Sequence, residues 1–337
     1  MTPADLLGAS ILVALVLYAL LGGADFGGGI WDLLAAGPRK AEQRALVEHA
    51  IGPIWEANHV WLILVVVVLF TAFPAAFAAI SVELFVPLVL LLAGIVLRGA
   101  SFTFRTYDRP DDDRVQARWG LVFSGSSVLA PLMLGVVVGA LASGRVRLAA
   151  QGSAPLAWLS PFPVAVGLLA AALFAYLAAT YLAVEAEGAL RDDFRRRAVA
   201  AGVAVFACAA AAAALSFREA PLVFAGLTHR RWSVALHLAT GAAAVTAFVM
   251  LFRGRVRAAR GAAAVQVALI VLGWGASQYP YLVVPDVTLL SASAPRATQV
   301  ALLWALAAGG ALLFPALAVL FRVFKGERPF SVVDRPR

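Results

Sequence analysis

The sequence has few charged residues, which make up 14% of its 337 positions. Soluble domains carry about 25%, so the composition excludes an ordinary soluble protein. Its one cysteine, Cys208, excludes an internal disulfide and a thiolate-bound iron–sulfur cluster made by this chain alone. The Cys-x-x-Cys-His motif of covalently attached haem and the His-Glu-x-x-His motif of zinc enzymes are also missing. Any chemistry must therefore depend on a small number of ionisable residues.

Hydrophobic residues, in contrast, make up 62% of the chain, and the mean hydropathy is +0.89. Apolar runs of about 20 residues recur, each long enough to cross roughly 30 Å of hydrocarbon. We predict an all-α, polytopic membrane protein, with about nine transmembrane helices packed as bundles and residues 1–337 forming a single integral membrane domain. The predicted spans are 6–35, 53–73, 79–100, 118–143, 161–185, 197–217, 232–252, 262–280 and 298–324.

The basic residues predict the orientation in the membrane. The net charge is +8, and most of the 27 lysines and arginines follow the first, third, fifth, seventh and ninth predicted spans. Cytoplasmic loops hold the excess of basic residues, so we expect the N-terminus outside and the C-terminus in the cytoplasm. Basic residues in short loops between apolar segments are topology signals. They predict contact with membrane lipid and no binding of nucleic acid.

Ionisable residues inside apolar runs are the strongest functional signal. Glu56 and His59 open the second predicted span, and Asp25 lies in the first. A carboxylate inside a bilayer costs roughly 3 kcal/mol, and such residues commonly mark ion or proton routes. Glu56 and His59 are three residues apart, which places them on one face of a helix. The predicted orientation brings all three near the cytoplasmic side. Glycines 27–29 indicate either close helix contact or a local break around Asp25.

These residues predict a proton uptake path that opens to the cytoplasm. Its members are Glu56, Asp25, His59, Asn58 and Trp55. The alternative interpretation is that the charged groups only hold helices together, for example by pairing Glu56 with Arg98. His59 is either a relay member or a structural histidine.

Two further charged residues are expected to have supporting roles. Arg98, near the cytoplasmic side, and Glu83, near the outer side, are assigned to structural ion pairing or support. A proton-coupled secondary transporter is the alternative function, and it would show paired broken helices in two matching halves. A few histidines and methionines lie in the spans, but a lone one is more often a packing residue than a haem ligand. We therefore assign no catalytic residue, metal or cofactor to this chain.

Several motifs resemble a known family. They are Gly-Gly-Ala-Asp-Phe-Gly-Gly-Gly-Ile-Trp-Asp (22–32), Pro-Ile-Trp-Glu-Ala-Asn-His-Val-Trp-Leu (53–62), Phe-Thr-Ala-Phe-Pro (70–74) and shorter segments at 97–99, 104–105, 180–182 and 278–281. Together they resemble the second subunit of cytochrome bd-type quinol oxidases, the cyanide-insensitive oxidase family. The likeness covers essentially the whole chain.

The resemblance implies a subunit of a terminal oxidase in a bacterial cytoplasmic membrane. In that family the complex oxidises quinol and reduces dioxygen to water, and haem b and haem d belong to the larger first subunit. The haem-free second subunit packs against that partner and lines a proton route from the cytoplasm.

The family's motifs also imply roles for single residues. Glu56, next to Trp55, holds the position of an acidic channel residue that is Asp in many members. Asp25 matches the acidic residue of the first helix, and His59 stands where some members have an uncharged amide. Some members hold a quinone as a structural lipid, but the sequence identifies no pocket for one. It also leaves open which quinone is used and whether a small accessory subunit exists.

Overall fold

The protein is almost wholly helical. The computed structural model describes residues 2–51, 58–106, 113–147 and 156–324. Its α-helices are α1 (Pro3–Leu33), α2 (Lys40–Ile51), α4 (Val60–Ala72), α5 (Pro74–Glu83), α6 (Phe85–Thr106), α7 (Asp113–Ala142), α8 (Pro161–Glu185), α9 (Gly188–Glu219), α10 (Pro221–His229), α11 (Arg231–Phe252), α12 (Val256–Gln278) and α13 (Arg296–Phe324). A 3₁₀ turn, η2 (Ala157–Leu159), precedes α8, and β1 (Tyr281–Val283) pairs antiparallel with β2 (Val287–Thr288).

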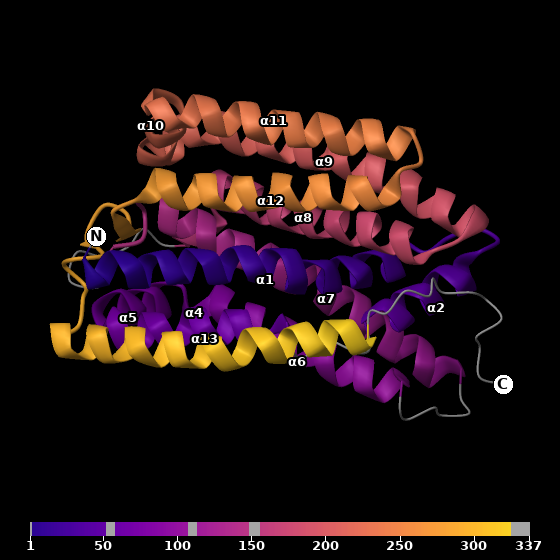
Figure 1. Ribbon diagram of the computed structural model, residues 1–337, viewed down its shortest axis with the longest axis horizontal. Helices are drawn as coiled ribbons and strands as arrows, with labels where there is room; N and C mark the ends of the chain where they lie inside the picture. Colours follow the sequence, from indigo (N-terminus) through magenta and orange to yellow (C-terminus); the bar gives the residue numbers. More distant parts are fainter. Residues whose placement is uncertain (1, 52–57, 107–112, 148–155, 325–337) are drawn as a thin grey trace.

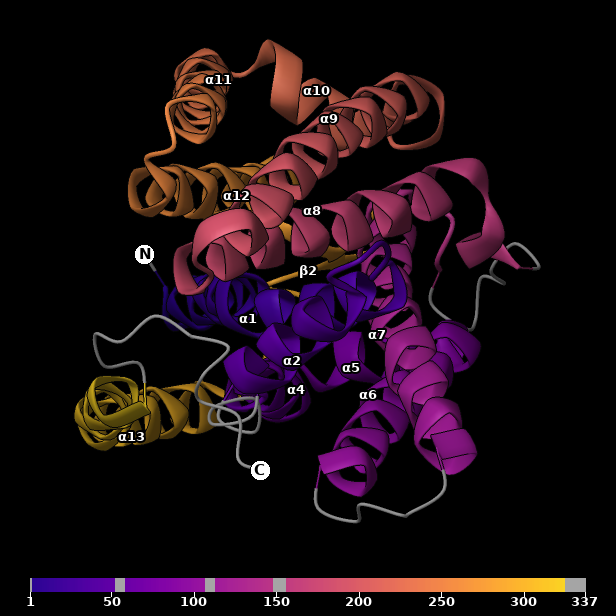
Figure 2. The same ribbon diagram turned by 90° about the vertical axis from the view of Figure 1, so that its right-hand side faces the viewer.

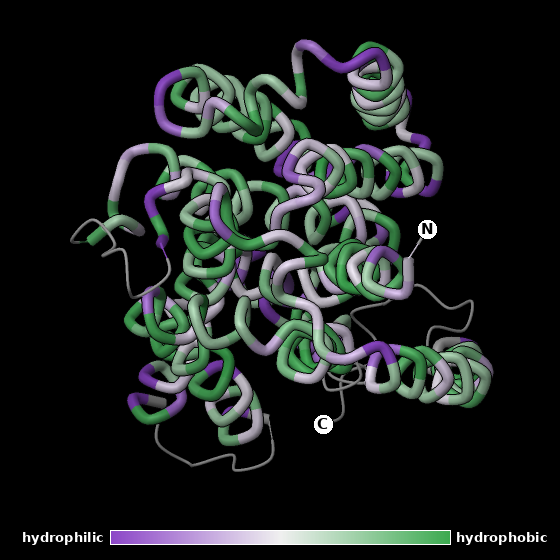
Figure 3. Tube along the Cα trace, turned by 90° about the vertical axis from the view of Figure 1, so that its left-hand side faces the viewer, coloured by the Kyte–Doolittle hydropathy of each residue, from purple (hydrophilic) through white to green (hydrophobic). Residues whose placement is uncertain are grey.

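Most of the helices are suited to a bilayer. Eight of them within the described ranges are long and apolar enough to cross a membrane, and the bent pair α4–α5 makes a ninth if it is counted as one span. Hydrophobic residues predominate along the helices (Figure 3), and many large ones, such as Phe206 and Leu312, are exposed at the surface. In water this pattern would aggregate, whereas in hydrocarbon it is the favoured surface. The prediction of an all-α polytopic membrane protein with about nine spans is confirmed.

The boundary between the second and third predicted spans was wrong. Residues 79–83 belong to α5 rather than to the third span, which begins at Phe85 as α6. Phe73 leaves the helical conformation, with φ −134° and ψ 58°, and Pro74 starts the next helix. Proline has no N–H to donate and disfavours helix in the residue before it. Consequently the helix axis bends by 117° between α4 and α5.

Successive long helices run in opposite directions (Figure 1). Helices α1, α6, α8, α11 and α13 all end on the side where α2 lies, and α7, α9 and α12 begin there. We call this side the α2 end. The basic segments after the odd-numbered spans follow helices that finish at this end, so it is the end that the sequence predicts to face the cytoplasm.

Helix α1 lies at the centre of the bundle. It contacts α4, α7, α8 and α12 (Figure 2). A methyl group at Gly27 would lie 2.5 Å from the carbonyl carbon of Phe174 on α8, and one at Gly29 would overlap the Ser127 side chain on α7. Helix α1 nevertheless continues without interruption from Pro3 to Leu33. The glycines therefore serve close helix contact, and the alternative of a break around Asp25 was wrong.

Candidate functional site

Asp25 lies inside the bundle, on the glycine-rich part of α1. Its side chain is buried, and Oδ2 accepts a hydrogen bond of 2.5 Å from Nδ2 of Asn58. Asn58 lies just before α4 and is itself buried. The same amide nitrogen is 3.5 Å from the carbonyl oxygen of Leu21, one turn earlier on α1. Asn58 thus links the start of α4 to the acidic turn of α1.

Arg98 brings a positive charge from α6 to the same place. Only 1% of its surface is exposed, and its charge interacts with that of Asp25. The guanidinium carbon lies 4.9 Å from the centre of the Phe26 ring and 5.4 Å from that of Phe123. Such cation–π contacts favour a desolvated guanidinium by about 2 kcal/mol. Aromatic faces and an opposite charge together make this buried cation tolerable.

His59 and Tyr18 complete this group. The His59 ring centre lies 5.8 Å from that of Phe26 and 6.0 Å from that of Tyr18. Tyr18 is almost fully buried, and its hydroxyl has no hydrogen-bond partner among the described residues. A buried hydroxyl without a partner is costly, so a water molecule is the partner expected here. We call Asp25, Asn58, His59, Arg98 and Tyr18 the Asp25 layer.

A second buried carboxylate lies deeper toward the α2 end. Asp32 is fully buried, and its oxygens accept 3.1 Å and 2.8 Å hydrogen bonds from Nη1 of Arg105 and Oγ of Ser124. The Arg44 Nε is 3.8 Å from the same carboxylate. Helices α1, α2, α6 and α7 therefore meet at this aspartate. We call Asp32, Arg44, Arg105 and Ser124 the Asp32 layer.

The two layers repeat one arrangement along the bundle. Asp25 and Asp32 are seven residues apart on α1, as Arg98 and Arg105 are on α6. Seven residues make about two turns, or about 10.5 Å, and return to the same helix face. The ring of Phe123 lies between the layers, 5.4 Å from the Arg98 guanidinium carbon and 5.9 Å from that of Arg105. The matching spacing of seven was visible in the sequence, but Asp32 was not identified from it.

The structure brings together four of the residues selected from the sequence, namely Asp25, Asn58, His59 and Arg98. Glu56 and Trp55 lie outside the described residues. Glu83 is the last residue of α5, at the end of the bundle opposite α2, and it forms no ion pair within the described ranges. Arg98 thus lies with the acidic group, whereas Glu83 is remote from it.

No group of three or more His, Cys, Asp or Glu side chains that could hold a metal ion is found among the residues the structure describes. The histidine at the Asp25 layer packs against the rings of Phe26 and Tyr18. The charged groups of the layers are carboxylates and guanidiniums. Carboxylates next to guanidinium groups can pair charges and exchange protons.

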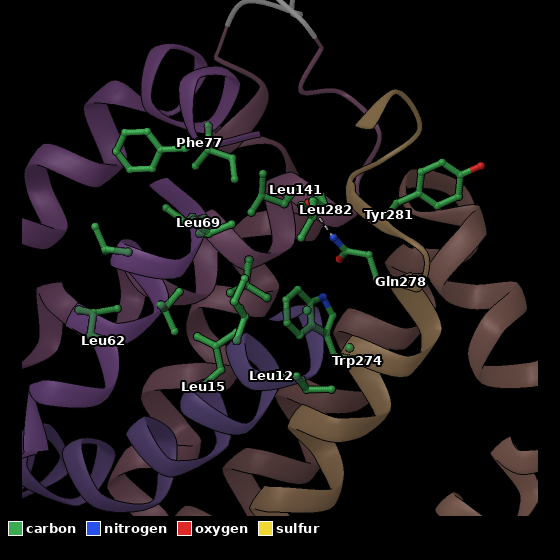
Figure 4. Close-up of a pocket in the computed structure, with 18 of the residues that line it drawn as sticks. Leu12, Leu15, Leu62, Leu69, Phe77, Leu141, Trp274, Gln278, Tyr281 and Leu282 are labelled. Atoms are coloured by element: carbon green, nitrogen blue, oxygen red, sulfur yellow. Dashed lines mark hydrogen bonds between the residues drawn. The ribbon is translucent and has the colours of Figure 1, made fainter. Parts of the chain in front are cut away.

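An apolar cavity of about 580 Å³ lies in the other half of the bundle, between α1, α4, α6, α7 and α12 (Figure 4). Leucine side chains such as Leu15, Leu62 and Leu69 form most of its wall. Two of the lining residues carry buried polar atoms without a hydrogen-bond partner among the described residues, Nε1 of Trp274 and Oε1 of Gln278. One is a donor and the other an acceptor. The cavity is therefore suited to a largely apolar molecule with a polar group at one end.

This fold and its two buried Asp–Arg layers define a polytopic membrane protein that keeps ionisable groups inside its helical bundle. Such groups usually mark ion or proton routes. The chain belongs to the cytochrome bd terminal oxidase subunit II family, whose model matches residues 4–324. The family inferred from the sequence motifs is thereby confirmed.

Individual relatives agree with this membership. The chain is 30% identical over 207 residues to the cytochrome bd-I ubiquinol oxidase subunit 2 of Escherichia coli K12, a match that covers 59% of this chain and 53% of that protein. The chain therefore spans about half the length of that relative. It is 23% identical to a putative cytochrome bd menaquinol oxidase subunit II of Bacillus subtilis, over 96% of each chain. A chain of the bd oxidase structure from Geobacillus thermodenitrificans shares its fold, with a TM-score of 0.79, 23% identity and coverage of 98% and 99%.

Proposed function

We propose that this chain is the haem-free second subunit of a terminal oxidase that oxidises quinol and reduces dioxygen to water. In this proposal residues 1–337 form one integral membrane domain that packs against a larger, haem-bearing first subunit. Haem b and haem d are bound by that partner and supply the redox chemistry. This chain contributes a proton uptake path that begins at the cytoplasmic side. Membership of the subunit II family supports the assignment.

The observation that carries the proton path is the pair of buried carboxylates on one face of α1. Asp25 and Asp32 lie about two turns apart, and each has a basic partner from α6. Buried carboxylates at successive depths could pass protons between them through hydroxyl groups and water. Ser124 at the Asp32 layer and Tyr18 at the Asp25 layer are hydroxyls in suitable places. Glu56, outside the described residues, stays a predicted member of the path.

The arginines have a different role in this proposal. A guanidinium stays protonated under all physiological conditions, so Arg98 and Arg105 cannot pass a proton on by releasing one. Their fixed positive charges instead balance the negative charges of Asp25 and Asp32 inside the bundle. The two carboxylates are the groups that would accept and release the protons. Drawing protons from the cytoplasm in this way would generate membrane potential, worth about 2.3 kcal/mol per elementary charge per 100 mV.

The test replaces Asp25 by Asn in the complete oxidase complex. The amide keeps nearly the same shape and removes only the titratable group, so we expect quinol-driven oxygen uptake to fall at least tenfold with an unchanged haem spectrum. Asp192→Asn is the matched control, because Asp192 is half exposed and its one ion pair within the described residues is with Arg195 on its own helix. Normal uptake by an assembled Asp25→Asn complex would contradict the proposal. Loss of the haem spectrum would favour a purely structural role.

Glu56 gives a second test of the same path. Glu56→Gln should lower oxygen uptake and leave the haem spectrum intact. Glu56→Asp, which keeps a carboxylate, should retain most of the activity. Equal uptake by the wild type and an assembled Glu56→Gln complex would remove Glu56 from the path.

The rival function is a proton-coupled secondary transporter. Transporters of this kind place broken helices at matching positions in two repeats. In the described residues α1 is continuous, and one bent pair, α4–α5, fits the description of a broken span. Purification separates the two functions. Co-purification of a larger chain with b and d haem bands and oxygen uptake supports the oxidase, and a haem-free chain from membranes rich in the oxidase supports the transporter.

The apolar cavity supports one further element, a quinone held as a structural lipid. The cavity volume of about 580 Å³ accommodates a quinone head group with part of its tail. Trp274 lines the cavity and carries a donor, Nε1, that has no partner among the described residues. Trp274→Phe removes this donor while keeping an aromatic ring, so we expect less quinone to be extracted per complex. Trp304→Phe on the exposed face of α13 is the control, and equal quinone content in both variants would contradict this assignment.

A further inference from the structure

A second, polar cavity lies at the α2 end of the bundle. Its volume is about 310 Å³, and it opens between the connection from α1 to α2 and the first turns of α9. The lining residues are Ala36, Pro38, Arg39, Gln43, Asp193, Arg196 and Arg197. Three of them carry a positive charge and one carries a negative charge. This excess of positive charge, in a cavity large enough for several water molecules, favours an anion.

Part of the charge is balanced within the cavity wall. Arg39 forms a two-pronged pair with Asp193, with hydrogen bonds of 2.8 Å from Nε and 2.6 Å from Nη2. This hydrogen bonding raises the pKa of Arg39. Gln43, which is buried, donates a third bond of 3.2 Å to the same carboxylate. Asp193 accepts hydrogen bonds from Arg39 and Gln43 and interacts with Arg197 through charge alone. One carboxylate thus faces three guanidinium groups, and the cavity wall keeps an excess of positive charge.

Arg197 is held in place by one hydrogen bond to Gln43 and by two aromatic rings, and one of its N–H groups has no acceptor in the part of the chain that the structure describes. Its Nη2 donates to Oε1 of Gln43 at 2.7 Å, and its guanidinium carbon lies 5.3 Å from the Trp31 ring and 5.2 Å from the Phe194 ring. Its Nη1 is buried and has no acceptor among the described residues. An unused buried donor costs about 1–3 kcal/mol, and more when the group is charged. The Arg197 guanidinium also lines the cavity, so its charge can pair with an anion there.

The cavity lies at the level where a lipid head group would lie. On α9 the long apolar run begins at Ala198, directly after Arg197, and continues away from the α2 end. Farther along the same helix, Val203 and Phe206 are exposed, Phe206 to 76%. Acyl chains can cover such exposed apolar residues while the head group stays beside the arginines. Basic pockets at this level between transmembrane helices suit anionic lipid head groups.

We propose that this cavity binds the phosphate ester of an anionic phospholipid through Arg196 and Arg197. Guanidinium groups pair with phosphate oxygens in two-pronged geometry, and Arg39 with Asp193 and Gln43 holds the opposite wall. Free inorganic phosphate has the same chemistry and is the alternative source of the anion. The site is independent of the proton path and of the oxidase activity.

The test measures thermal stability of the delipidated, detergent-solubilised complex with added phosphatidylglycerol, phosphatidylcholine of the same acyl chains, or inorganic phosphate. Phosphatidylglycerol should raise Tm in a saturable way, and phosphatidylcholine should not. Arg196→Gln should raise the half-saturating concentration of phosphatidylglycerol roughly tenfold. Arg196 is exposed and has no hydrogen bond or ion pair to another described residue, so this variant should fold.

Arg195→Gln is the matched control, with the same charge change one residue away on α9. Arg195 pairs with Asp192 and does not line the cavity, so its half-saturating concentration should stay within about twofold of the wild type. Equal effects of the two variants would overturn the proposed site. Stabilisation by inorganic phosphate that Arg196→Gln abolishes, without any by phosphatidylglycerol, would overturn the lipid as its occupant.

Discussion

The contact between α1 and α8 at Gly27 leads to a quantitative prediction. A methyl group added there would lie 2.5 Å from the carbonyl carbon of Phe174 and closer still to its oxygen, whereas ordinary contact begins at 3.4 Å. The two backbones would have to move apart by at least about 0.9 Å, because a carbonyl group cannot rotate out of the way. Overpacking typically costs 1–3 kcal/mol. We expect Gly27→Ala to lower the free energy of unfolding by about 3 kcal/mol, the upper end of this range.

The entropy of unfolding grows with chain length, so for 337 residues a loss of about 3 kcal/mol lowers Tm by roughly 4 °C. The apparent Tm of the detergent-solubilised complex measures this change. Gly261→Ala in α12 is the control, because a methyl group there meets no atom within 4 Å. Alanine is the better helix former by about 1 kcal/mol, so this control should be neutral or slightly more stable. A Gly27→Ala complex as stable as the wild type would refute the close approach of α1 and α8 on which the position of Asp25 depends.

Two further predictions concern neighbouring contacts. Asp32→Asn should lower the free energy of unfolding by about 1.5–3 kcal/mol because the partly buried Arg105 loses its charged hydrogen-bond partner. Adding Arg105→Gln should restore part of that loss in a double-mutant cycle, and strict additivity would show that the pair is not coupled. Trp31→Phe should cost about 1–3 kcal/mol, because it removes the 2.7 Å hydrogen bond from Nε1 to the carbonyl oxygen of Ala175. An unchanged Tm would show that this bond is absent from the assembled complex.

The sequence was sufficient for the membrane class, most helix boundaries and the family. The apolar runs are long, and several begin beside proline or end at charged residues, so 161–185 coincides with α8. The bend at Phe73 was not predicted, although Pro74 was visible. A proline within an apolar stretch is compatible with a kinked span as well as with a new helix, and only the packing of α5 decides between them.

The candidate site was predicted in part. Asp25, Asn58, His59 and Arg98 were selected because polar residues in apolar runs are conspicuous, and the structure places them together. Asp32 was missed because it lies near the end of its span. Charged residues are common there, since they can usually reach water, so the sequence did not single it out. Its burial results from Arg44 on α2, Arg105 on α6 and Ser124 on α7, which contribute from three separate segments of the chain.

The ring of Phe123 between the two layers has a consequence for hydration. A proton moves along hydrogen bonds of about 2.8 Å. The two layers are about 10.5 Å apart, so a proton passing between them needs roughly three intervening oxygen atoms. An aromatic ring offers none, and the arginines on either side of it hold their protons. Conduction along α1 would therefore depend on a short file of water beside Phe123. Turnover of the complex should then respond to osmotic stress, which removes water from narrow apolar passages without altering any residue.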